Sequence, residues 1–400
     1  MLPASIAIDE MKYRQPGESF EEKCSRIADA LKDDEDHFRR FYNILLEQKF
    51  LPAGRIQSTM GAARKSTPYN CFVSDTIPDS MEGIMDTAKN AATTMRLGGG
   101  IGYDFSTLRS RGDFIRSTGS TSSGPVSFMR IFDAVCSTVA AAGHRRGAQM
   151  GVLRVDHPDI EEFIRAKHNT TNLTNFNVSV GVTNKFMEAV EKDEPFDLIF
   201  DNRVYNTVSA KNLWNEIMRS TWDWAEPGVL FLDTINRENN LKYVETIAAT
   251  NPCAEQPLPP NGACLLGSFN LVKYLVPVGD NKYGFNHAAF SSDIACVVRA
   301  MDNVVDRAIY PLASQREEAL SKRRMGLGVT GAANALEAMG CLYGDDDFLS
   351  GLDAILRTLA VESYRASIQL AEEKGAFPLF DYNKWGASHI VSSVVEEHPP

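Results

Sequence analysis

Apolar residues recur at helical spacing near the start of the chain, and this periodicity then gives way to other patterns. Between residues 18 and 48 they return every three to four positions, which predicts two amphipathic helices. Residues 50–61 are rich in Pro, Gly and small polar side chains, the composition of a loop that lines a cleft. A further helix is expected after Asp79 or Ser80, since either can cap it and apolar positions continue through Met95.

Strand and helix patterns alternate over the rest of the chain, without a short repeat. Strands are predicted at 69–73, 152–155, 175–182, 196–200, 229–232 and within 323–331. Helices are predicted at 128–142, 184–192, 211–224, 293–305, 333–339 and 352–374. This alternation predicts an α/β fold with a parallel or mixed sheet. We expect a helical N-terminal region at 1–49 and one large domain at 50–400.

Two loops combine arginines with glycine residues or with hydroxyl side chains. Residues 104–124 hold Arg109, Arg111 and Arg116 beside a Ser/Thr/Gly tract, which suits phosphate binding, although a solvated linker remains the alternative. Residues 143–151 form a second, basic loop between glycines. The glycine run 98–102 follows a helix and lacks dinucleotide-loop spacing, which disfavours a Rossmann site.

Composition and charge narrow the class of protein. The chain is 44% apolar and 23% charged, and no apolar run is long enough to cross a bilayer. A net charge of −11 argues against a protein that binds nucleic acid through its overall electrostatic field, because such binding needs a basic surface. Because no secretion signal is visible at the N-terminus, we expect a cytoplasmic protein with neither a nucleic-acid nor a membrane partner.

The seven cysteines are odd in number, widely spread and never in Cys-x-x-Cys spacing. This pattern disfavours a disulfide framework and a zinc site, and no metal ligands are predicted. His157 is expected to be a turn or capping residue. Cysteines that matter for function should therefore be catalytic, and the others buried packing residues.

Residues 251–256, Asn-Pro-Cys-Ala-Glu-Gln, concentrate chemistry in one short stretch. In an extended segment alternate side chains share a side, so Asn251, Cys253 and Glu255 would face one substrate together. Cys264 lies eleven residues beyond Cys253. A second nearby thiol suggests redox chemistry.

These motifs, taken in order, resemble the large catalytic subunit of ribonucleotide reductase, and the similarity runs from about Phe50 to Asp381. The matching segments are 69–71, 98–102, 156–163, 251–256, 262–264 and 323–329. The resemblance implies a ten-stranded α/β barrel, of the type shared with glycyl-radical enzymes, with the active cysteine on a finger loop inside it. It also implies conversion of ribonucleotides, expected to be diphosphates, to deoxyribonucleotides.

The resemblance assigns roles residue by residue. Cys253 would be the thiyl radical that removes hydrogen from ribose C3′, Glu255 the base for the 3′-hydroxyl, and Asn251 the residue that holds the substrate and the Glu255 carboxylate. Cys71 and Cys264 would form the redox-active pair that reduces C2′, and a thioredoxin- or glutaredoxin-type protein would reduce their disulfide. Chemically, two thiols supply the two electrons that replacing a hydroxyl by hydrogen requires.

Further residues match the family's nucleotide contacts. Ser58, Asn70 and Gly100 would bind substrate. Asp79 and Arg109 would bind a dNTP or ATP effector at a homodimer interface, and Arg146 lies in the loop that would pass effector identity to the substrate base. The motif around Cys253 favours adenosylcobalamin as the radical source; a metal-containing partner subunit is the alternative.

Several family features are absent from the 400 residues. We find no N-terminal nucleotide-binding cone, phosphate-binding loop, C-terminal cysteine pair or radical-importing tyrosine pair. We therefore expect a C-terminally incomplete barrel and a complementing polypeptide. A non-catalytic effector-binding or assembly fragment is the alternative function, and a glycyl-radical lyase is disfavoured because its glycine motif is not visible.

Overall fold

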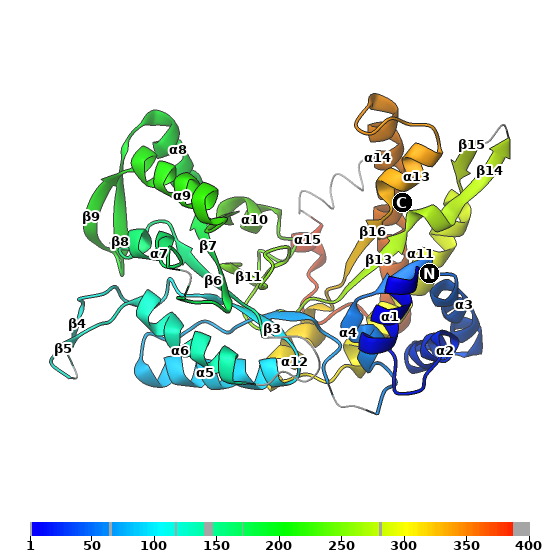
Figure 1. The fold of residues 1–400 in the computed structure, drawn as a ribbon, viewed down its shortest axis with the longest axis horizontal. Helices are drawn as coiled ribbons and strands as arrows, with labels where there is room; N and C mark the ends of the chain where they lie inside the picture. Colours follow the sequence, from blue (N-terminus) through cyan, green and yellow to red (C-terminus); the bar gives the residue numbers. More distant parts are fainter. Residues whose placement is uncertain are drawn as a thin grey trace. The chain divides into compact units, whose positions relative to one another are not determined.

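A computed structural model describes residues 2–63, 66–116, 118–139, 147–169, 171–279 and 282–386. The chain divides into two compact units (Figure 1). The first unit comprises Met1–Asn70, Cys264–Tyr310 and Arg316–Phe380, and the second comprises Cys71–Ala263, Pro311–Gln315 and Asp381–Pro400. Each unit therefore gathers segments that are distant in sequence.

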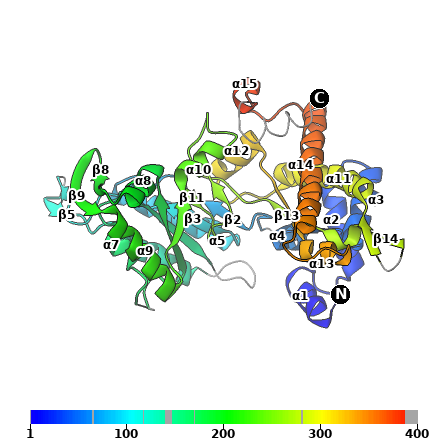
Figure 2. The same cartoon turned by 90° about the horizontal axis from the view of Figure 1, so that it is seen from above.

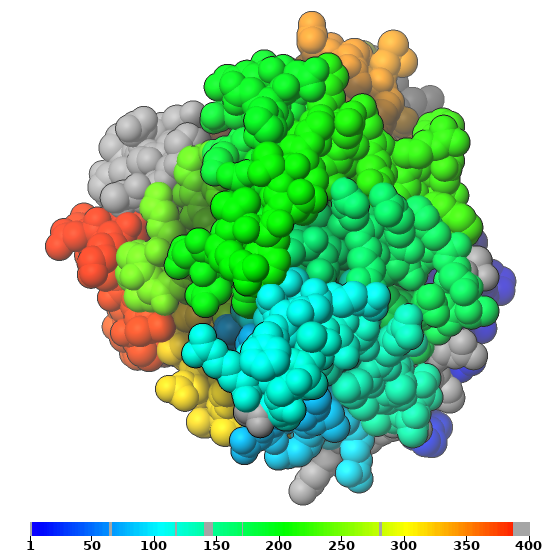
Figure 3. Space-filling model, turned by 90° about the vertical axis from the view of Figure 1, so that its left-hand side faces the viewer, coloured from blue at the N-terminus to red at the C-terminus, as the bar shows by residue number. Residues whose placement is uncertain are grey.

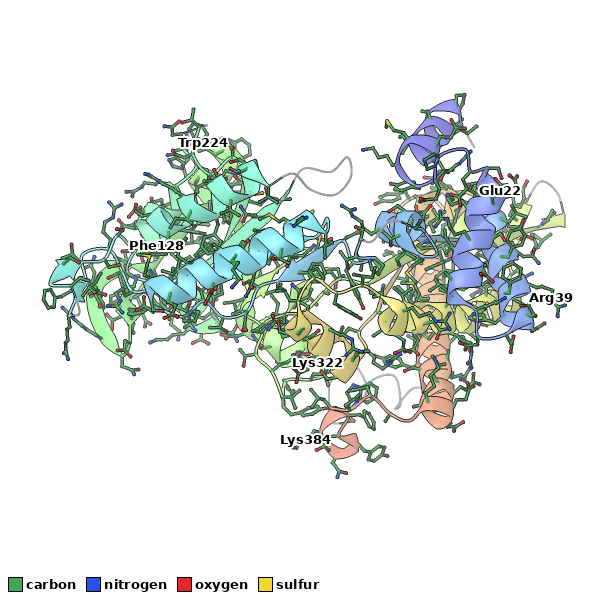
Figure 4. The ribbon with its side chains drawn as sticks, turned by 90° about the horizontal axis from the view of Figure 1, so that it is seen from below. Glu22, Arg39, Phe128, Trp224, Lys322 and Lys384 are labelled. Carbon is green, nitrogen blue, oxygen red and sulfur yellow. The ribbon has the colours of Figure 1, made fainter. Side chains whose placement is uncertain are left out.

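Helices make up most of the first unit. They are α1 (Pro3–Lys12), α2 (Phe20–Leu31), α3 (Glu35–Leu46), α4 (Gly54–Thr59), η1 (Leu271–Tyr274), α11 (His287–Arg307), α13 (Ala332–Ala338) and α14 (Asp346–Lys374); α12 (Ala313–Lys322) begins in the second unit and ends in the first. Ser19 caps α2 through a reciprocal pair of hydrogen bonds with Glu22. Glu22 and Arg39 mark the exposed faces of α2 and α3 (Figure 4), while the apolar faces pack on the long α11.

A small mixed sheet completes the first unit. Within the described chain its strand order is β1 (Phe50–Pro52), β13 (Leu266–Asn270), β16 (Gly326–Thr330), with β1 antiparallel and β16 parallel to β13. Phe269 on β13 contacts Phe50 and Phe290, with ring centroids 5.0 and 5.3 Å away. A separate hairpin joins β14 (Leu275–Gly279) to β15 (Lys282–Phe285). The aromatic cluster ties the sheet to α11, and Figure 2 shows α14 beside α11 in the same unit.

The second unit is built on a parallel sheet. In the described residues it has five strands, in the order β10 (Gly228–Phe231), β7 (Phe176–Val182), β6 (Gln149–Arg154), β3 (Gly100–Asp104), β2 (Cys71–Val73). Tyr103, Phe105, Phe132 and Phe176 form a buried aromatic cluster. Because parallel strands need crossover connections, helices lie between them in sequence.

Helices and short hairpins surround this sheet. The helices are α5 (Met81–Arg96), α6 (Pro125–Thr138), α7 (Ile160–Ile164), α8 (Asn184–Lys192), α9 (Ala210–Trp224), α10 (Leu232–Glu238) and α15 (Tyr382–Trp385). The hairpins are β4 (Phe114–Ile115) with β5 (Ser120–Thr121), β8 (Pro195–Phe200) with β9 (Arg203–Ser209), and β11 (Ala249–Thr250) with β12 (Pro257–Leu258). Tyr205 on β9 donates a hydrogen bond to Asp113 near β4, which joins the cyan and green segments seen in Figure 3.

Most predicted elements are confirmed. The two N-terminal helices appear as α2 and α3, Ser80 rather than Asp79 caps α5, and the alternating pattern at 175–182 is β7. The loop predicted at 50–61 is wrong in part, because α4 occupies Gly54–Thr59, and α1 was not predicted. In the part of the chain that the structure describes, none of the helices is both long and apolar enough to span a bilayer.

Candidate active site

One face of the parallel sheet carries Gly102 and Asn177 in a single row with two apolar residues. Residues paired across a sheet project to the same face, as do alternate residues of one strand. The pairs Val73–Gly102, Gly102–Met150 and Met150–Asn177 thus form one row on this face, which we call the glycine face. Cys71 pairs with Gly100 two positions earlier and belongs to the same face.

The β11–β12 hairpin packs directly on the glycine face. A Cβ atom on Gly102 would lie 1.7 Å from the carbonyl oxygen of Thr250, and one on Gly100 would lie 2.8 Å from Cγ of Pro252. The Asn177 side chain donates a hydrogen bond of 2.7 Å to the carbonyl oxygen of Pro252. Gly100, a predicted substrate contact, and Gly102 therefore leave room for the protein's own hairpin.

Residues 251–256 form the loop of this hairpin, so the prediction of an extended segment is wrong. Ala249 pairs with Leu258 and Thr250 with Pro257, which reverses the chain between them. Ala254 takes a left-handed conformation with φ of 66°, and its N–H donates to the carbonyl oxygen of Asn251. These local bonds turn the chain, and strand alternation does not apply.

The turn brings Asn251 and Glu255 together in a way the alternation did not predict. Asn251 is fully buried, and its Nδ2 donates to Oε2 of Glu255 at 2.6 Å. Its Oδ1 accepts from the backbone N–H of Gln256 at 2.9 Å. Glu255 and Cys253 are themselves exposed. A buried amide thus fixes the orientation of an exposed carboxylate within two residues of an exposed thiol.

The predicted redox cysteines differ from Cys253 in burial. Cys71 and Cys264 are both buried. In the second unit, Phe72 forms an antiparallel bridge with Ala263, and the N–H of Val73 donates to the carbonyl oxygen of Gly262 at 2.8 Å. Cys71 precedes Phe72 in sequence, and Cys264 follows Ala263.

Burial predicts that Cys253 is the thiol most reactive towards alkylating agents. Burial raises the pKa of Cys24 and Cys136 to about 11 and that of Cys296 to about 12. At pH 8 a thiol of pKa 11 is ionised in roughly one molecule in a thousand, and only the thiolate reacts. Iodoacetamide with mass spectrometry should therefore modify Cys253 first. Cys253→Ser should remove the fast phase of alkylation, and Cys341→Ser should keep it. A fast phase that survives Cys253→Ser would show that Cys253 is not the most accessible thiol.

The predicted substrate residues lie in different surroundings. Asn70 has a buried Oδ1 with no hydrogen-bond partner among the described residues. Its neighbour Tyr69 is buried, and the Tyr69 hydroxyl lies 2.9 Å from that of Tyr310. Ser58 lies on α4, where its hydroxyl donates to the carbonyl oxygen of Arg55. Asn70 thus offers an acceptor to a ligand, whereas Ser58 is engaged with its own helix.

The predicted effector residues Asp79 and Arg109 are brought together. Nε of Arg109 lies 2.7 Å from Oδ2 of Asp79, and the Arg109 backbone N–H donates to Oδ1 at 3.3 Å. Both side chains are about one third exposed. Arg146, the third predicted effector residue, lies outside the described residues.

Residues 156–159 form a polar turn in which His157 is buried. Nδ1 of His157 accepts a hydrogen bond from the N–H of Asp159, and Nε2 lies 2.8 Å from the carbonyl oxygen of Leu108. Burial lowers the pKa of His157, so the neutral ring donates through Nε2. Burial raises the pKa of Asp159, which accepts from the N–H of Arg111. The expectation that His157 is a turn residue is confirmed.

Sequence reasoning missed three residues that position the loop. Asn177, Gly102 and Thr250 hold the hairpin against the sheet. The signal for Asn177 was present, since it is a polar residue in the alternating pattern of 175–182, and its face could have been expected to meet a polar partner.

Comparison with known proteins identifies the family. Residues 69–399 match the family model described as ribonucleotide reductase, barrel domain, and residues 5–65 match ribonucleotide reductase, all-alpha domain. The chain is similar to two proteins named vitamin B12-dependent ribonucleoside-diphosphate reductase. It is 37% identical over 371 residues to that of Thermoplasma acidophilum, covering 92% of this chain and 47% of the relative. It is 37% identical over 386 residues to that of Mycobacterium tuberculosis H37Rv, covering 94% and 54%.

The structure matches the Actinobacillus ureae class Id ribonucleotide reductase alpha subunit with a TM-score of 0.80 and 22% identity, covering 96% of this chain and 70% of that one. This likeness shows the fold, an N-terminal helical domain with an α/β barrel region. The chain spans about half the length of the curated relatives named above. With the barrel-domain model matched over most of its residues, the chain belongs to the ribonucleotide reductase large-subunit family.

Proposed function

We propose that this chain is a ribonucleotide reductase catalytic chain that converts ribonucleoside diphosphates to 2′-deoxyribonucleotides for DNA synthesis. One observation carries the proposal: an exposed thiol, Cys253, and a carboxylate oriented by a buried amide share a hairpin loop packed on the face that holds Cys71. The diphosphate substrate agrees with the names of the similar proteins.

The proposed roles divide the chemistry among the side chains. Cys253, as a thiyl radical, takes the hydrogen atom from ribose C3′ and later returns it. Glu255 accepts the proton of the 3′-hydroxyl, and Asn251 holds that carboxylate through its Nδ2 donor. The 2′-hydroxyl leaves as water after protonation by a thiol of the reducing pair. The products are a deoxyribonucleotide, water and a disulfide, so atoms and the two electrons balance.

We assign the reducing pair to Cys71 and Cys264. The bridge between Phe72 and Ala263 supports this pairing, since the two cysteines are the sequence neighbours of the bridged residues. A thioredoxin- or glutaredoxin-type protein would reduce the disulfide by thiol exchange. Asn70 and Gly100 are proposed to contact substrate, and the unpartnered Oδ1 of Asn70 is the supporting feature. Ser58 is also proposed as a substrate contact, although its hydroxyl donates within its own helix.

Adenosylcobalamin is the cofactor that we propose, by the printed names of the relatives. The exposed position of Cys253 fits a bulky group, because the thiol is accessible while Cys71 and Cys264 are buried. When bound, this cofactor supplies the radical from which the Cys253 thiyl derives. Radical import from a metal-containing partner subunit is the alternative.

Regulation and assembly are proposed from the family resemblance. Asp79 and Arg109, with Arg146, would bind a dNTP or ATP effector at a homodimer interface, and the ion pair between the first two supports a shared site. The ten-stranded barrel, its completion by a further polypeptide, the domain boundary at residue 50 and a cytoplasmic location stay predictions.

The direct test is product formation. The chain, alone and with any polypeptide encoded beside it, is incubated with ribonucleoside diphosphate, a dithiol and adenosylcobalamin, and deoxyribonucleotide is measured by chromatography. We expect product that depends on the dithiol and on adenosylcobalamin. Omission of each component is the matched control. Effector binding without product in any combination would favour the non-catalytic alternative.

A further inference from the structure

Asn177 contacts the active loop from outside it. Its Nδ2 donates to the carbonyl oxygen of Pro252 at 2.7 Å. This carbonyl is part of the peptide bond that links Pro252 to Cys253. Other hydrogen bonds of the loop, such as those of Asn251 with Glu255 and Gln256, join residues of the loop to each other. The Asn177 bond joins the loop to β7.

The position of Asn177 in the sheet gives this bond a rigid origin. At Asn177 the backbone of β7 pairs with β6, opposite Met150, and from Ser179 onward β7 pairs with β10 as well. Along β7 the other residues are buried, whereas Asn177 is exposed. Asn177 is the second residue of β7, and its exposed side chain directs its amide at the loop and not into the packed interior of the sheet.

Contacts of the hairpin with β3, on the same face of the sheet as Asn177, explain why one hydrogen bond can matter. Gly102 meets the Thr250 carbonyl oxygen and Gly100 meets Pro252, so the hairpin stem rests on β3. These contacts limit how closely the hairpin can approach the sheet, but they do not prevent its loop from moving away from the sheet. A donated hydrogen bond at Pro252 opposes lifting at the residue before Cys253.

We infer that Asn177 is a positioning residue that holds the peptide bond before Cys253, and so sets where the reactive thiol stands over the glycine face. The inference rests on the proposed function for its consequence in catalysis, but the tethering itself is a property of the chain. Without the donor, the loop retains its internal bonds and moves as a unit.

The substitution Asn177→Asp separates tethering from packing, because the two side chains have the same shape. An ionised carboxylate cannot donate and repels the Pro252 carbonyl oxygen, whereas a protonated carboxyl donates through its O–H. We expect amide hydrogen exchange of the peptide 249–258, corrected for intrinsic rates, to accelerate about fivefold to tenfold at pH 7.5, the loss of one hydrogen bond. The acceleration should shrink as the pH falls and the introduced carboxyl is protonated.

In the holoenzyme assay, kcat should fall about fivefold to tenfold with KM unchanged, and it should recover towards low pH relative to wild type. Asn202→Asp is the matched control: it adds the same charge at an exposed turn, and Asp tolerates the left-handed conformation found there. It should change neither measurement.

Two results would overturn the inference. One is wild-type exchange rates for peptide 249–258 in both Asn177→Asp and Asn177→Ala. The other is an acceleration in Asn177→Asp that is equal at every pH, which would indicate a packing defect. If wild type forms no deoxyribonucleotide, the proposed function fails, yet the exchange measurement still decides whether Asn177 tethers the loop.

Discussion

Replacing Cys253 by serine is expected to abolish deoxyribonucleotide formation, with a loss of at least about a thousandfold. Serine preserves the size of the side chain, and the hairpin loop is held by Asn251, Ala254 and Gln256, so the loop should keep its shape. A hydroxyl, however, has a stronger bond to hydrogen than a thiol and does not form the radical that the proposed chemistry needs. The defect should therefore lie in kcat, with substrate binding retained.

The measurement is single-turnover product formation with reduced enzyme, together with equilibrium binding of the ribonucleotide. Cys341→Ser is the matched control, since this cysteine lies on the first unit and is partly exposed. We expect it to retain wild-type activity. Product formation by Cys253→Ser at more than one tenth of the wild-type rate would exclude Cys253 as the radical residue and leave the barrel without its proposed chemistry.

Replacing Gly102 by alanine is expected to destabilise the second unit by about 3 kcal/mol, the upper end of the range typical of overpacking. The added Cβ would lie 1.7 Å from the Thr250 carbonyl oxygen. Both atoms belong to or sit directly on backbone, so no side-chain rotation relieves the overlap. The hairpin or the strand must shift, which should also displace Cys253 and reduce activity.

Two alanine variants provide graded controls in urea unfolding monitored by circular dichroism. Gly328→Ala changes a strand glycine whose added Cβ meets only Ser268 Oγ at 3.7 Å, an ordinary contact, and should shift the free energy of unfolding by less than about 1 kcal/mol. Gly100→Ala meets the Pro252 ring at 2.8 Å, which can move by a ring pucker, and should be intermediate. Equal urea midpoints for the Gly102, Gly100 and Gly328 variants would show that the hairpin does not rest on β3.

The pattern of apolar positions predicted most elements, because helix and strand periodicities are local properties of the chain. It failed at α4, where Pro, Gly and small polar residues resemble a loop but the Gly54–Thr59 backbone forms a six-residue helix within the first unit. It also failed at 251–256, where a strand-like spacing hides a turn. Left-handed Ala254 and the buried Asn251 side chain make that turn, and neither follows from apolar periodicity.

By itself the sequence determined the α/β class and the family, because residue types and motif order are sufficient for these, and it predicted the reactive groups that we propose. Only the tertiary structure decided how Asn251 reaches Glu255 and why Gly100 and Gly102 lack side chains. It also identified Asn177 as a contact of the loop, although 75 residues separate it from Pro252. The physical reason is that hydrogen bonds and close backbone contacts depend on which strands become neighbours, and sheet order is not written in local periodicity.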